Sequence, residues 1–188
     1  MKILTEKRAE NFLKKQGFNV INTAFAKKES EIKTVLKKFR FPVVMKISSK
    51  KIIHKTKIKG VKLGIKNYNE ALKAFNELKK IRGFEGVLIQ EQVKGREFLV
   101  GLKKTNDFGF VVGFGKGGSK AEKLKDIEFR VCNVKGFDEL SENKNVKKIL
   151  IKLCKLSEKY PEIDSLDINP LIVNKKQAVI VDSQVFFE

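Results

Sequence analysis

The sequence contains Leu166-Asp167-Ile168-Asn169-Pro170-Leu171 and then Val181-Asp182. These stretches lie in two apolar runs, 166–173 and 178–186, with a polar turn at 174–177 between them. Apolar runs on either side of a short polar turn predict two antiparallel strands joined as a hairpin. The fold prediction starts from this hairpin because its pairing register follows from the position of the turn.

A turn centred between Lys175 and Lys176 pairs residues whose numbers add to 351. Asn169 then faces Asp182, with Cβ atoms about 4.5–5.5 Å apart on one face of the sheet, and Asp167 lies two residues away on the same face. Amide and carboxylate oxygens suit Mg²⁺, whose remaining ligands are commonly phosphates. The register predicts a magnesium site at Asn169 and Asp182. The alternative is an ordinary polar sheet face, and a slip of one residue would separate the pair.

The rest of the chain alternates between helical and extended patterns. Apolar residues at helical spacing predict helices at 4–16, 29–40, 69–82 and 143–160. Thr5 and Asn69 are the expected N-caps of the first and third helices. Extended patterns predict strands at 43–47, 61–65, 86–93, 96–103, 108–114 and 128–134. This mixture predicts an α+β fold.

The length of 188 residues corresponds to one domain or to two closely joined subdomains. After Gly95 the pattern changes from mixed helix and strand to mainly strand. We therefore expect a smaller subdomain at about 18–92 and a larger one at about 93–188, the latter packed with helix 4–16.

Charge is the most pronounced feature of the composition. The chain has 41 Lys and Arg residues against 22 Asp and Glu, a net charge of +19. Such a field attracts polyanions, including nucleic acid, nucleotides, coenzyme A and acidic partner subunits. Lysine is much commoner than arginine, the lysines are spread along the chain, and no nucleic-acid-binding motif is recognisable. These features argue against nucleic acid as a partner and favour a solvated, lysine-rich surface.

The sequence predicts a cytoplasmic protein with no membrane partner. No apolar run reaches the roughly 18 residues that cross a bilayer. The first residues, Met1-Lys2-Ile3-Leu4-Thr5, become polar at once and lack the apolar segment of a secretory signal. Cys132 and Cys154 alone make neither a disulfide framework nor a zinc site. We expect both thiols to be reduced.

Lys46 and a glycine-rich loop are candidate phosphate ligands. Lys46 ends an apolar strand, where its ammonium needs an anion unless the side chain reaches solvent. The loop 114–119 contains Gly115, Gly117 and Gly118. Glycine backbone amides can approach a phosphate closely, although such glycines also serve in plain tight turns. The spacing matches neither a Walker loop nor a Rossmann fingerprint.

Polar residues where the two lobes join are candidate ligands of a base and a ribose. Gln90, Glu91 and Glu97 lie in this stretch, for which a solvated strand exit is the alternative. His54 is the only histidine in the chain. Any proton or phosphoryl transfer by an imidazole at neutral pH must therefore use His54. The alternative interpretation is that His54 is an ordinary solvated residue of a loop.

Taken in order, these motifs resemble one family: the β subunits, or ATP-grasp domains, of ADP-forming acyl-CoA (acetyl-CoA) synthetases, relatives of succinyl-CoA synthetase β. The resemblance covers essentially the whole chain. It rests on 42–49 followed by Ile53-His54-Lys55-Thr56 and Gly60-Val61, on 87–91 with Gly95-Arg96-Glu97, on Gly115-Lys116-Gly117-Gly118, and on 166–171 with Val181-Asp182.

The resemblance implies an ATP-grasp fold, in which two α+β subdomains clamp the nucleotide. Lys46 would hold phosphates, Glu91 and the backbone around Val93 would face the adenine, and Glu97 would face the ribose or the phosphates. The resemblance further implies that Asn169 and Asp182 bind Mg²⁺. The implied nucleotide-binding set is completed by Lys55, Gln90, Gly115, Gly117 and Gly118.

The family interconverts acid, ATP and CoA with acyl-CoA, ADP and phosphate. By resemblance, this chain would transfer a phosphoryl group between a phosphohistidine and ADP or ATP, with His54 as an acceptor on a mobile loop. A partner α subunit would carry the CoA-binding and phosphohistidine domains. We therefore expect the chain alone to bind nucleotide without thioester turnover.

Three positions depart from the family pattern, and one of them is Lys116, an unusual residue within the glycine loop. Ser165 stands where the family usually has Glu, which affects the support of the metal site, and Lys59 stands where it usually has Gly, which stiffens the histidine loop. Two other functions remain open from the sequence. One is an ATP-grasp carboxylate ligase that forms an acyl phosphate and does not need His54. The other is a basic, non-catalytic module that binds nucleic acid on the same fold.

Overall fold

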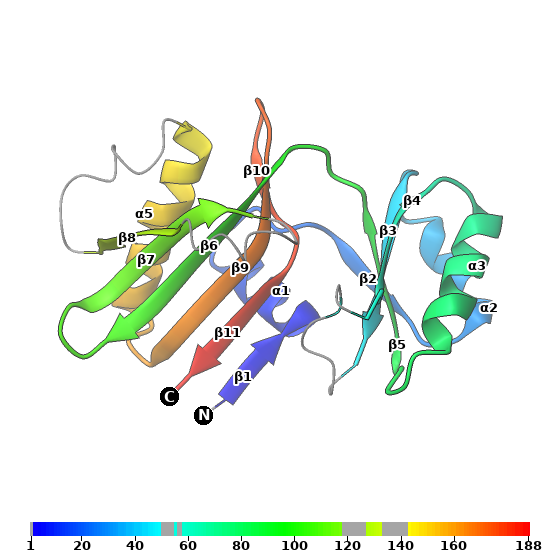
Figure 1. The fold of residues 1–188 in the computed structure, drawn as a ribbon, viewed down its shortest axis with the longest axis horizontal. Helices are drawn as coiled ribbons and strands as arrows, with labels where there is room; N and C mark the ends of the chain where they lie inside the picture. Colours follow the sequence, from blue (N-terminus) through cyan, green and yellow to red (C-terminus); the bar gives the residue numbers. More distant parts are fainter. Residues whose placement is uncertain (1, 50–54, 56–57, 118–126, 133–142) are drawn as a thin grey trace. The chain divides into compact units, whose positions relative to one another are not determined.

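The computed structural model describes residues 2–49, 55, 58–117, 127–132 and 143–188. Two predicted site residues, His54 and Gly118, lie outside the described residues. The chain divides into two compact units, residues 1–20 with 94–188 and residues 21–93. Each unit is built on an antiparallel sheet with helices against it (Figure 1), which confirms the predicted α+β fold.

The larger unit, residues 1–20 and 94–188, contains a seven-stranded sheet in the order β1-β11-β9-β6-β7-β8, with β10 also paired to β9. Helices α1 (Glu6–Lys15) and α5 (Lys144–Lys159) pack on one face of it. The strands are β1 (Lys2–Thr5), β6 (Arg96–Thr105), β7 (Gly109–Lys116), β8 (Ile127–Val131), β9 (Ile163–Val173), β10 (Ala178–Ile180) and β11 (Ser183–Phe187).

Alternation along the strands produces the core of this unit. Val100 and Leu102 of β6 and Leu166 and Ile168 of β9 are at most 1% exposed and pack in one cluster with Leu153 of α5. Residues between them point to the opposite side of the sheet, because successive side chains of a strand alternate. We call the side of each sheet opposite its own helices the helix-free face.

The predicted helix 143–160 is confirmed as α5. Its N-cap, Asn143, accepts a hydrogen bond from the Asn145 amide over 2.9 Å, which satisfies a donor that the first turn leaves without an intrahelical partner. Leu150 and Leu153 bury its apolar stripe against the sheet. Among the helices that the structure describes, none has the length and hydropathy that a membrane span requires.

The predicted helix 4–16 begins later than expected. Residues 2–5 form strand β1, and α1 begins at Glu6. Strand β1 pairs with β11 at the other end of the sequence, with Leu4 opposite Val185. This long-range pairing overrides the local helical pattern at the start of the chain.

The smaller unit, residues 21–93, has a four-stranded sheet in the order β2-β5-β3-β4. Its strands are β2 (Thr23–Ala26), β3 (Val43–Ser48), β4 (Val61–Ile65) and β5 (Gly86–Glu91). Helices α2 (Glu29–Leu36) and α3 (Tyr68–Lys79) cover one face, where Val43, Met45 and Ile47 of β3 are fully buried.

Helix α3 is capped by Asn67 and not by the predicted Asn69. The Asn67 side chain accepts from the Glu70 amide over 2.9 Å, and the Glu70 carboxylate in turn accepts from the Lys66 amide over 2.8 Å. This reciprocal arrangement satisfies two backbone donors at the helix start. The predicted helices 29–40 and 69–82 also end earlier, at Leu36 and Lys79.

The expectation of reduced thiols is wrong in this structure. Cys132, directly after β8, forms a disulfide with Cys154 of α5, and their Cα atoms are 5.2 Å apart. Sequence spacing could not reveal this pair because the two cysteines are 22 residues apart on different elements. They meet because α5 packs against β7, the strand with which β8 pairs.

Candidate functional site

The closing hairpin has the register predicted from its turn. Leu171 of β9 faces Ile180 of β10, and Ile168 of β9 faces Ser183 of β11. Between these two pairs, the Asn169 amide donates to the Asp182 carbonyl oxygen over 3.1 Å. The predicted pairing of Asn169 with Asp182 is therefore confirmed at the level of the backbone.

Asn169 lies in a β-bulge. On the other side of β9, the register with β6 shifts so that Asn169 and Pro170 together oppose Leu99. A bulge bends its strand and redirects side chains, and bulges are frequent next to active sites. The segment that pairs with this part of β9 bends at Asp182, between β10 and β11. The two predicted metal ligands therefore share one kink in two neighbouring strands.

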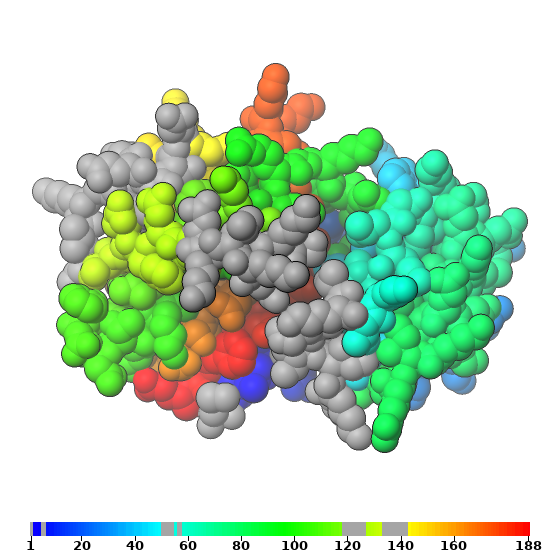
Figure 2. Space-filling view, viewed as in Figure 1, coloured from blue at the N-terminus to red at the C-terminus, as the bar shows by residue number. Residues whose placement is uncertain are grey.

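Both residues lie on the helix-free face of the large sheet. Ile168 and Leu171 border the bulge and are 0% exposed, and Ile180 and Ser183 border the bend and are at most 2% exposed. Two residues lie between each of these pairs: Asn169 and Pro170 in β9, and Val181 and Asp182 in the segment opposite. They therefore point away from this core, because of strand alternation and the bulge. Figure 2 shows β9 in orange and β11 in red beside each other on one side of this unit.

The donor set at the kink fits a hard cation. Asn169 offers an amide oxygen, and Asp182 offers a carboxylate whose Oδ1 accepts the Ser183 amide over 3.0 Å and is thereby oriented. In the described part of the chain, no group of three or more His, Cys, Asp and Glu residues could hold a metal ion. Water and phosphate oxygens would have to complete the coordination, which is usual for Mg²⁺.

Asp167 is a third acidic or amide side chain on the same face. It pairs with Gly101 of β6, and a Cβ atom at Gly101 would lie 3.6 Å from Asp167 Oδ1. This separation is an ordinary van der Waals distance, so the Asp167 carboxyl lies beside β6 at this position. Partial burial raises the pKa of Asp167, and Lys103 opposes the shift, although the residue as a whole is exposed to solvent.

Glu97 and the predicted glycine loop adjoin the bulge on β6 and β7. Glu97 is exposed and pairs with Ile172, and Gly115 pairs with Leu99. The Gly117 amide donates to the Glu97 carbonyl oxygen over 2.8 Å, and a Cβ at Gly117 would lie 2.5–2.7 Å from backbone atoms of Phe98. Packing against β6 therefore requires a glycine at 117, whatever its role toward a phosphate.

Lys46 and Gln90 lie on the helix-free face of the small sheet. Lys46 alternates with the core residues of β3 and pairs with Leu88, whereas Gln90 pairs with Val44. The two polar residues are therefore diagonal neighbours, about 7–8 Å apart. Lys46 is 6% exposed and Gln90 1%. An ammonium at this depth is stabilised by anions, and a nucleotide phosphate is such an anion.

Gln90 is oriented by a neighbouring strand. Its Nε2 donates to Thr23 Oγ1 on β2 over 2.8 Å, which fixes the amide in one direction. A pre-oriented amide on the same face as Lys46 suits recognition of a polar ligand, because little side-chain freedom is lost on binding.

The Glu91 side chain lies on the opposite side of the same sheet. Glu91 pairs with the core residue Val43, and its Oε1 accepts from the Arg40 amide over 2.8 Å. A ligand contact near this position would therefore use main-chain groups around Val93, which is half-buried. Lys55 is a half-buried turn residue whose carbonyl oxygen accepts from the Gly60 amide over 2.8 Å.

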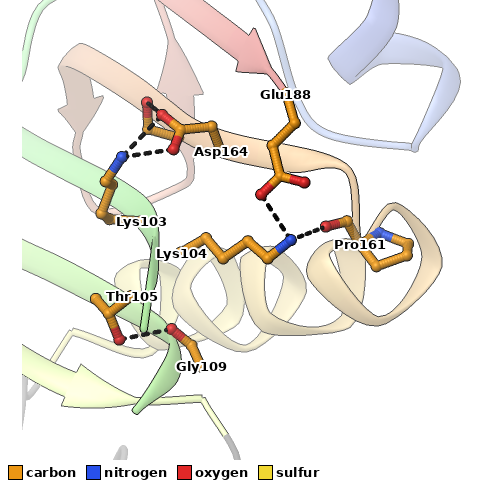
Figure 3. Close-up of polar contacts among 8 residues, drawn as sticks. Lys103, Lys104, Thr105, Gly109, Pro161, Asp164 and Glu188 are labelled. Atoms are coloured by element: carbon orange, nitrogen blue, oxygen red, sulfur yellow. Dashed lines mark hydrogen bonds and ion pairs between the residues drawn. The ribbon is translucent and has the colours of Figure 1, made fainter. Parts of the chain in front are cut away.

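Charged pairs lie at the end of β6 away from the bulge. Figure 3 shows Lys103 bonded to Asp164 and Lys104 bonded to Glu188. Lys103 Nζ reaches both carboxylate oxygens of Asp164, at 2.7 and 2.8 Å, and this contact is the main reason why the pKa of Asp164 is lowered. These exposed pairs join β6 to β9 and to the C-terminal residue, and they are separate from the bulge.

The sequence reasoning missed a junction around Gln92. Gln92 Oε1 accepts the Gly64 amide over 2.7 Å, and the Gln92 amide donates to the Pro42 carbonyl oxygen over 2.9 Å. Gly64 has a φ of +71° and lies inside strand β4, where the pairing with β3 is irregular. A glycine inside a predicted strand is a signal of a bulge, and this signal could have located the junction.

A family model described as an ATP-grasp domain matches residues 1–138 and 134–186. The β subunit of acetate–CoA ligase (ADP-forming) I from Pyrococcus furiosus is 33% identical, and the alignment covers 97% of this chain and 90% of that protein. Acetate–CoA ligase (ADP-forming) II from Archaeoglobus fulgidus is 34% identical over 97% of this chain, which spans only 30% of that longer protein.

Solved structures of the dinucleotide-forming acetyl-coenzyme A synthetase 1 from Candidatus Korarchaeum cryptofilum are also similar. Its complex with coenzyme A, Ca-AMPCP and HgCl⁺ has a TM-score of 0.89 at 28% identity and covers 100% of this chain and 94% of that chain. Its complex with coenzyme A and Mg-AMPPCP, in which a phosphohistidine segment points towards the nucleotide binding site, has a TM-score of 0.83 at 27% identity, with 100% and 93% coverage. The chain described here therefore belongs to the ATP-grasp family and is homologous, over nearly its whole length, to the β subunits of ADP-forming acetyl-CoA synthetases.

Proposed function

We propose that this chain is the nucleotide-binding β subunit of an ADP-forming acyl-CoA synthetase. In the complete enzyme, acid, ATP and CoA would be interconverted with acyl-CoA, ADP and phosphate. An α subunit would carry the CoA-binding and phosphohistidine domains. The similarity to the P. furiosus β subunit supports a separate α subunit. The shared kink at Asn169 and Asp182 is the structural observation that carries the proposal.

Asn169 and Asp182 would hold Mg²⁺ through their side-chain oxygens, which lie on one face of two paired strands. When bound, the ion would neutralise charge on the phosphate oxygens of the nucleotide. Lys46 would add a second positive charge to those phosphates, and its burial strengthens that interaction because little water screens it. Phosphoryl transfer depends mainly on such positioning and charge neutralisation.

His54 would carry the phosphoryl group in transit. The N–P bond of a phosphohistidine would break as an oxygen of the ADP β-phosphate forms the new P–O bond, and the released ring nitrogen would take up a proton from water, which leaves a neutral imidazole and ATP. Gln90, the main chain around Val93, and Glu97 would hold the nucleoside, whereas Lys55, Gly115, Gly117 and Gly118 would contact phosphates. These assignments follow the family resemblance of the motifs.

The first test is calorimetric titration of the purified chain with ADP and ATP, with and without Mg²⁺. We expect nucleotide binding that Mg²⁺ strengthens at least tenfold, and no acyl-CoA formation by the chain alone. Acyl-CoA formation without a partner would overturn the proposed need for an α subunit. Salt-sensitive binding to duplex DNA or RNA, without Mg²⁺-dependent nucleotide binding, would instead support a basic non-catalytic module.

The second test replaces His54 with alanine and assays ATP formation from a phosphorylated α subunit that co-purifies with the chain. We expect phosphoryl transfer to be lost while ADP binding remains. Unchanged transfer would favour a carboxylate ligase that forms an acyl phosphate directly. Lys55→Ala is the matched control in the same segment, because it should weaken nucleotide binding without abolishing transfer.

A further inference from the structure

The chain passes between its two units twice, at residues 20–21 and at residues 93–94. On the side of the larger unit, both passages contact the hairpin of β9 and β10. We call residues 173–178, where this hairpin turns, the hairpin tip. Asn169 and Asp182 lie at the other end of the same hairpin, so the contacts at its tip concern the candidate metal site.

The first passage is held by Asn19. Its Nδ2 donates to the Ala178 carbonyl oxygen over 3.0 Å and to Gln177 Oε1 over 3.1 Å. Its carbonyl oxygen accepts from the Ile180 amide over 2.9 Å, and Val20 forms a parallel bridge with Ile180. The end of this segment therefore lies along β10 until the chain leaves the larger unit.

The second passage is held by Asn174. Its Nδ2 donates to the Lys94 carbonyl oxygen over 3.3 Å. The next residue, Gly95, packs so closely on the hairpin that a Cβ atom would lie 2.5 Å from the Val173 carbonyl oxygen. Arg96 then pairs with Val173 as β6 begins. Both passages therefore contact the same few residues of the hairpin tip.

Hydrogen bonds fix the orientation of the Asn174 side-chain amide. Its Oδ1 accepts from the backbone amides of Lys176 and Gln177, each over 3.0 Å, and these bonds close the turn. Because an amide oxygen accepts and an amide nitrogen donates, the nitrogen must face the Lys94 carbonyl oxygen. The side chain therefore has two separable functions: the oxygen shapes the turn, and the nitrogen holds the passage.

The strands of the hairpin join its tip to the kink at Asn169 and Asp182. Leu171 and Ile180 pair with each other and are 0% exposed, and they pack in the core of the larger unit. Buried and paired strands are among the least mobile parts of a fold. The hairpin therefore keeps both passages at a fixed position with respect to the metal ligands for as long as the contacts at its tip persist.

Residues that the proposed function assigns to the nucleotide lie directly beyond the passages. Val93 precedes Lys94, and Gln90 lies on the strand before it. Thr23, whose hydroxyl accepts the hydrogen bond that orients Gln90, follows the first passage. Each passage therefore connects the hairpin to a group that would bind or orient the nucleoside.

We propose that the hairpin tip is the anchor of both passages, and that Asn174 and Asn19 are positioning residues for Mg²⁺-dependent nucleotide binding. The inference rests on the proposed function and adds the element that links its two halves. A nucleotide whose phosphates share Mg²⁺ with Asn169 and Asp182, and whose base contacts residues 90–93, binds at two places that the anchor joins. Fixing the passages raises the effective concentration of one place for a ligand held at the other.

The anchor is tested by limited trypsin digestion of the full chain, because trypsin cleaves the bond after Lys94, whose carbonyl group Asn174 holds. Asn174→Asp removes the donor to that carbonyl but keeps an oxygen for the turn. We expect cleavage after Lys94 to become about three- to tenfold faster, which corresponds to the loss of one hydrogen bond. Cleavage after Arg82, between α3 and β5, is expected to stay unchanged.

The positioning role is tested by calorimetric titration with ADP, with and without Mg²⁺. Asn174→Asp is expected to weaken Mg-ADP binding about three- to tenfold and to change the binding of Mg²⁺-free ADP by less than about twofold. Without the ion, the phosphates have no link to Asn169 and Asp182, so the anchor contributes little. A merely structural loss would weaken the binding of both ligands alike and would lower the melting temperature.

Lys175→Gln is the matched control for charge. It lowers the charge of the same turn by one unit, as Asn174→Asp does, and it leaves the amides of Asn174 and Asn19 in place. We expect this control to change neither trypsin cleavage nor ADP affinity. Asn19→Ala tests the first passage, because it removes both side-chain donors to the hairpin tip. It is expected to reduce the Mg²⁺ enhancement of ADP affinity, as Asn174→Asp does.

The possible contrary results separate the parts of this account. Unchanged cleavage after Lys94 in Asn174→Asp would refute the anchor, and faster cleavage with unchanged Mg-ADP affinity would refute the positioning role. An equal effect of Lys175→Gln would attribute the change to charge and would also refute that role. Failure of the unaltered chain to bind ADP would refute the proposed function, whereas cleavage after Lys94 would still decide on the anchor.

Discussion

The amide of Asn169 donates to the carbonyl oxygen of Asp182 over 3.1 Å at the point where both of their strands bend. The backbone therefore joins the two residues before any ligand arrives. Their side chains emerge on one face because the core residues on either side, Ile168 and Ser183, point to the other. A metal site formed by these two side chains would be pre-organised, since ligand binding need not bring two separate strands together.

Asp182→Asn is expected to abolish Mg²⁺-assisted nucleotide binding without unfolding the chain. The amide keeps an oxygen that can accept the Ser183 backbone amide, but the negative charge that attracts the cation is lost. We expect the Mg²⁺ enhancement of ADP affinity to fall at least tenfold, with the melting temperature nearly unchanged. Gln184→Ala, two residues further along on β11 and on the same face, is the control, and an equal effect there would contradict a specific role of the carboxylate.

Asp167→Asn is expected to stabilise the metal-free chain at neutral pH. Burial raises the folded-state pKa of Asp167 above its unfolded value of about 3.9. Between these two pKa values the folded state binds more protons, so stability falls as pH rises through that window. The gain from the amide should be below about 1 kcal/mol, because the residue retains solvent contact.

Urea unfolding in EDTA, from pH 3 to pH 7, measures this effect. The advantage of Asp167→Asn should be largest at neutral pH and should vanish as pH falls below the unfolded pKa. Asp164→Asn provides a contrast of opposite sign. Lys103 lowers the folded pKa of Asp164, so its stabilising contribution is present above the unfolded pKa and is lost as pH falls through the folded one.

The features that sequence could predict are those fixed by local pattern. The hairpin register followed from the centre of one turn, and α5 followed from the helical period of its apolar residues. The bulge at Asn169 could not be predicted, because it arises from pairing with β6 on the far side of the strand. Strand β1 was missed for the same reason, since its partner β11 lies at the other end of the sequence.

The placement of the site residues also depended on long-range pairing that the sequence does not show. Strands β3 and β5 were predicted from the sequence, but which of their residues face the helices was not. Lys46 and Gln90 could therefore be recognised as neighbours on one face only once the register of β3 with β5 was known. The side chain of Glu91 bonds to the Arg40 amide on the other face, a contact that depends on how the loop before β3 folds back.

Lys59→Gly is expected to stabilise the chain by about 0.5–1 kcal/mol. Lys59 has a φ of +57°, in the left-handed region where a Cβ atom is unfavourable and glycine is not. The family commonly has glycine here, so the lysine replaces a residue suited to the conformation. Chemical denaturation of the variant measures the gain. Lys59→Ala retains the Cβ and should bring little benefit, and an equal gain from alanine would attribute the effect to charge.

Reduction of the Cys132–Cys154 disulfide is expected to lower the free energy of unfolding by about 3 kcal/mol. The bond closes a loop across a sequence separation of 22 residues, and its removal increases the conformational freedom of the unfolded chain. Urea denaturation with and without dithiothreitol measures the difference. In the variant with both cysteines replaced by serine, dithiothreitol should have no effect.

The loss of stability should be concentrated at β8. This strand pairs only with β7 in the described sheet order, and its residues Ile127–Val131 are half-buried or exposed, so packing contributes little to its retention. The disulfide joins the residue after β8 to Cys154, which is 5% exposed in the core of α5. Reduction should therefore speed amide hydrogen exchange in β8 more than in β9, whose residues are paired on both sides. Alkylation of both thiols in the native, unreduced protein would contradict the bond, and uniform acceleration across the sheet would contradict its local action.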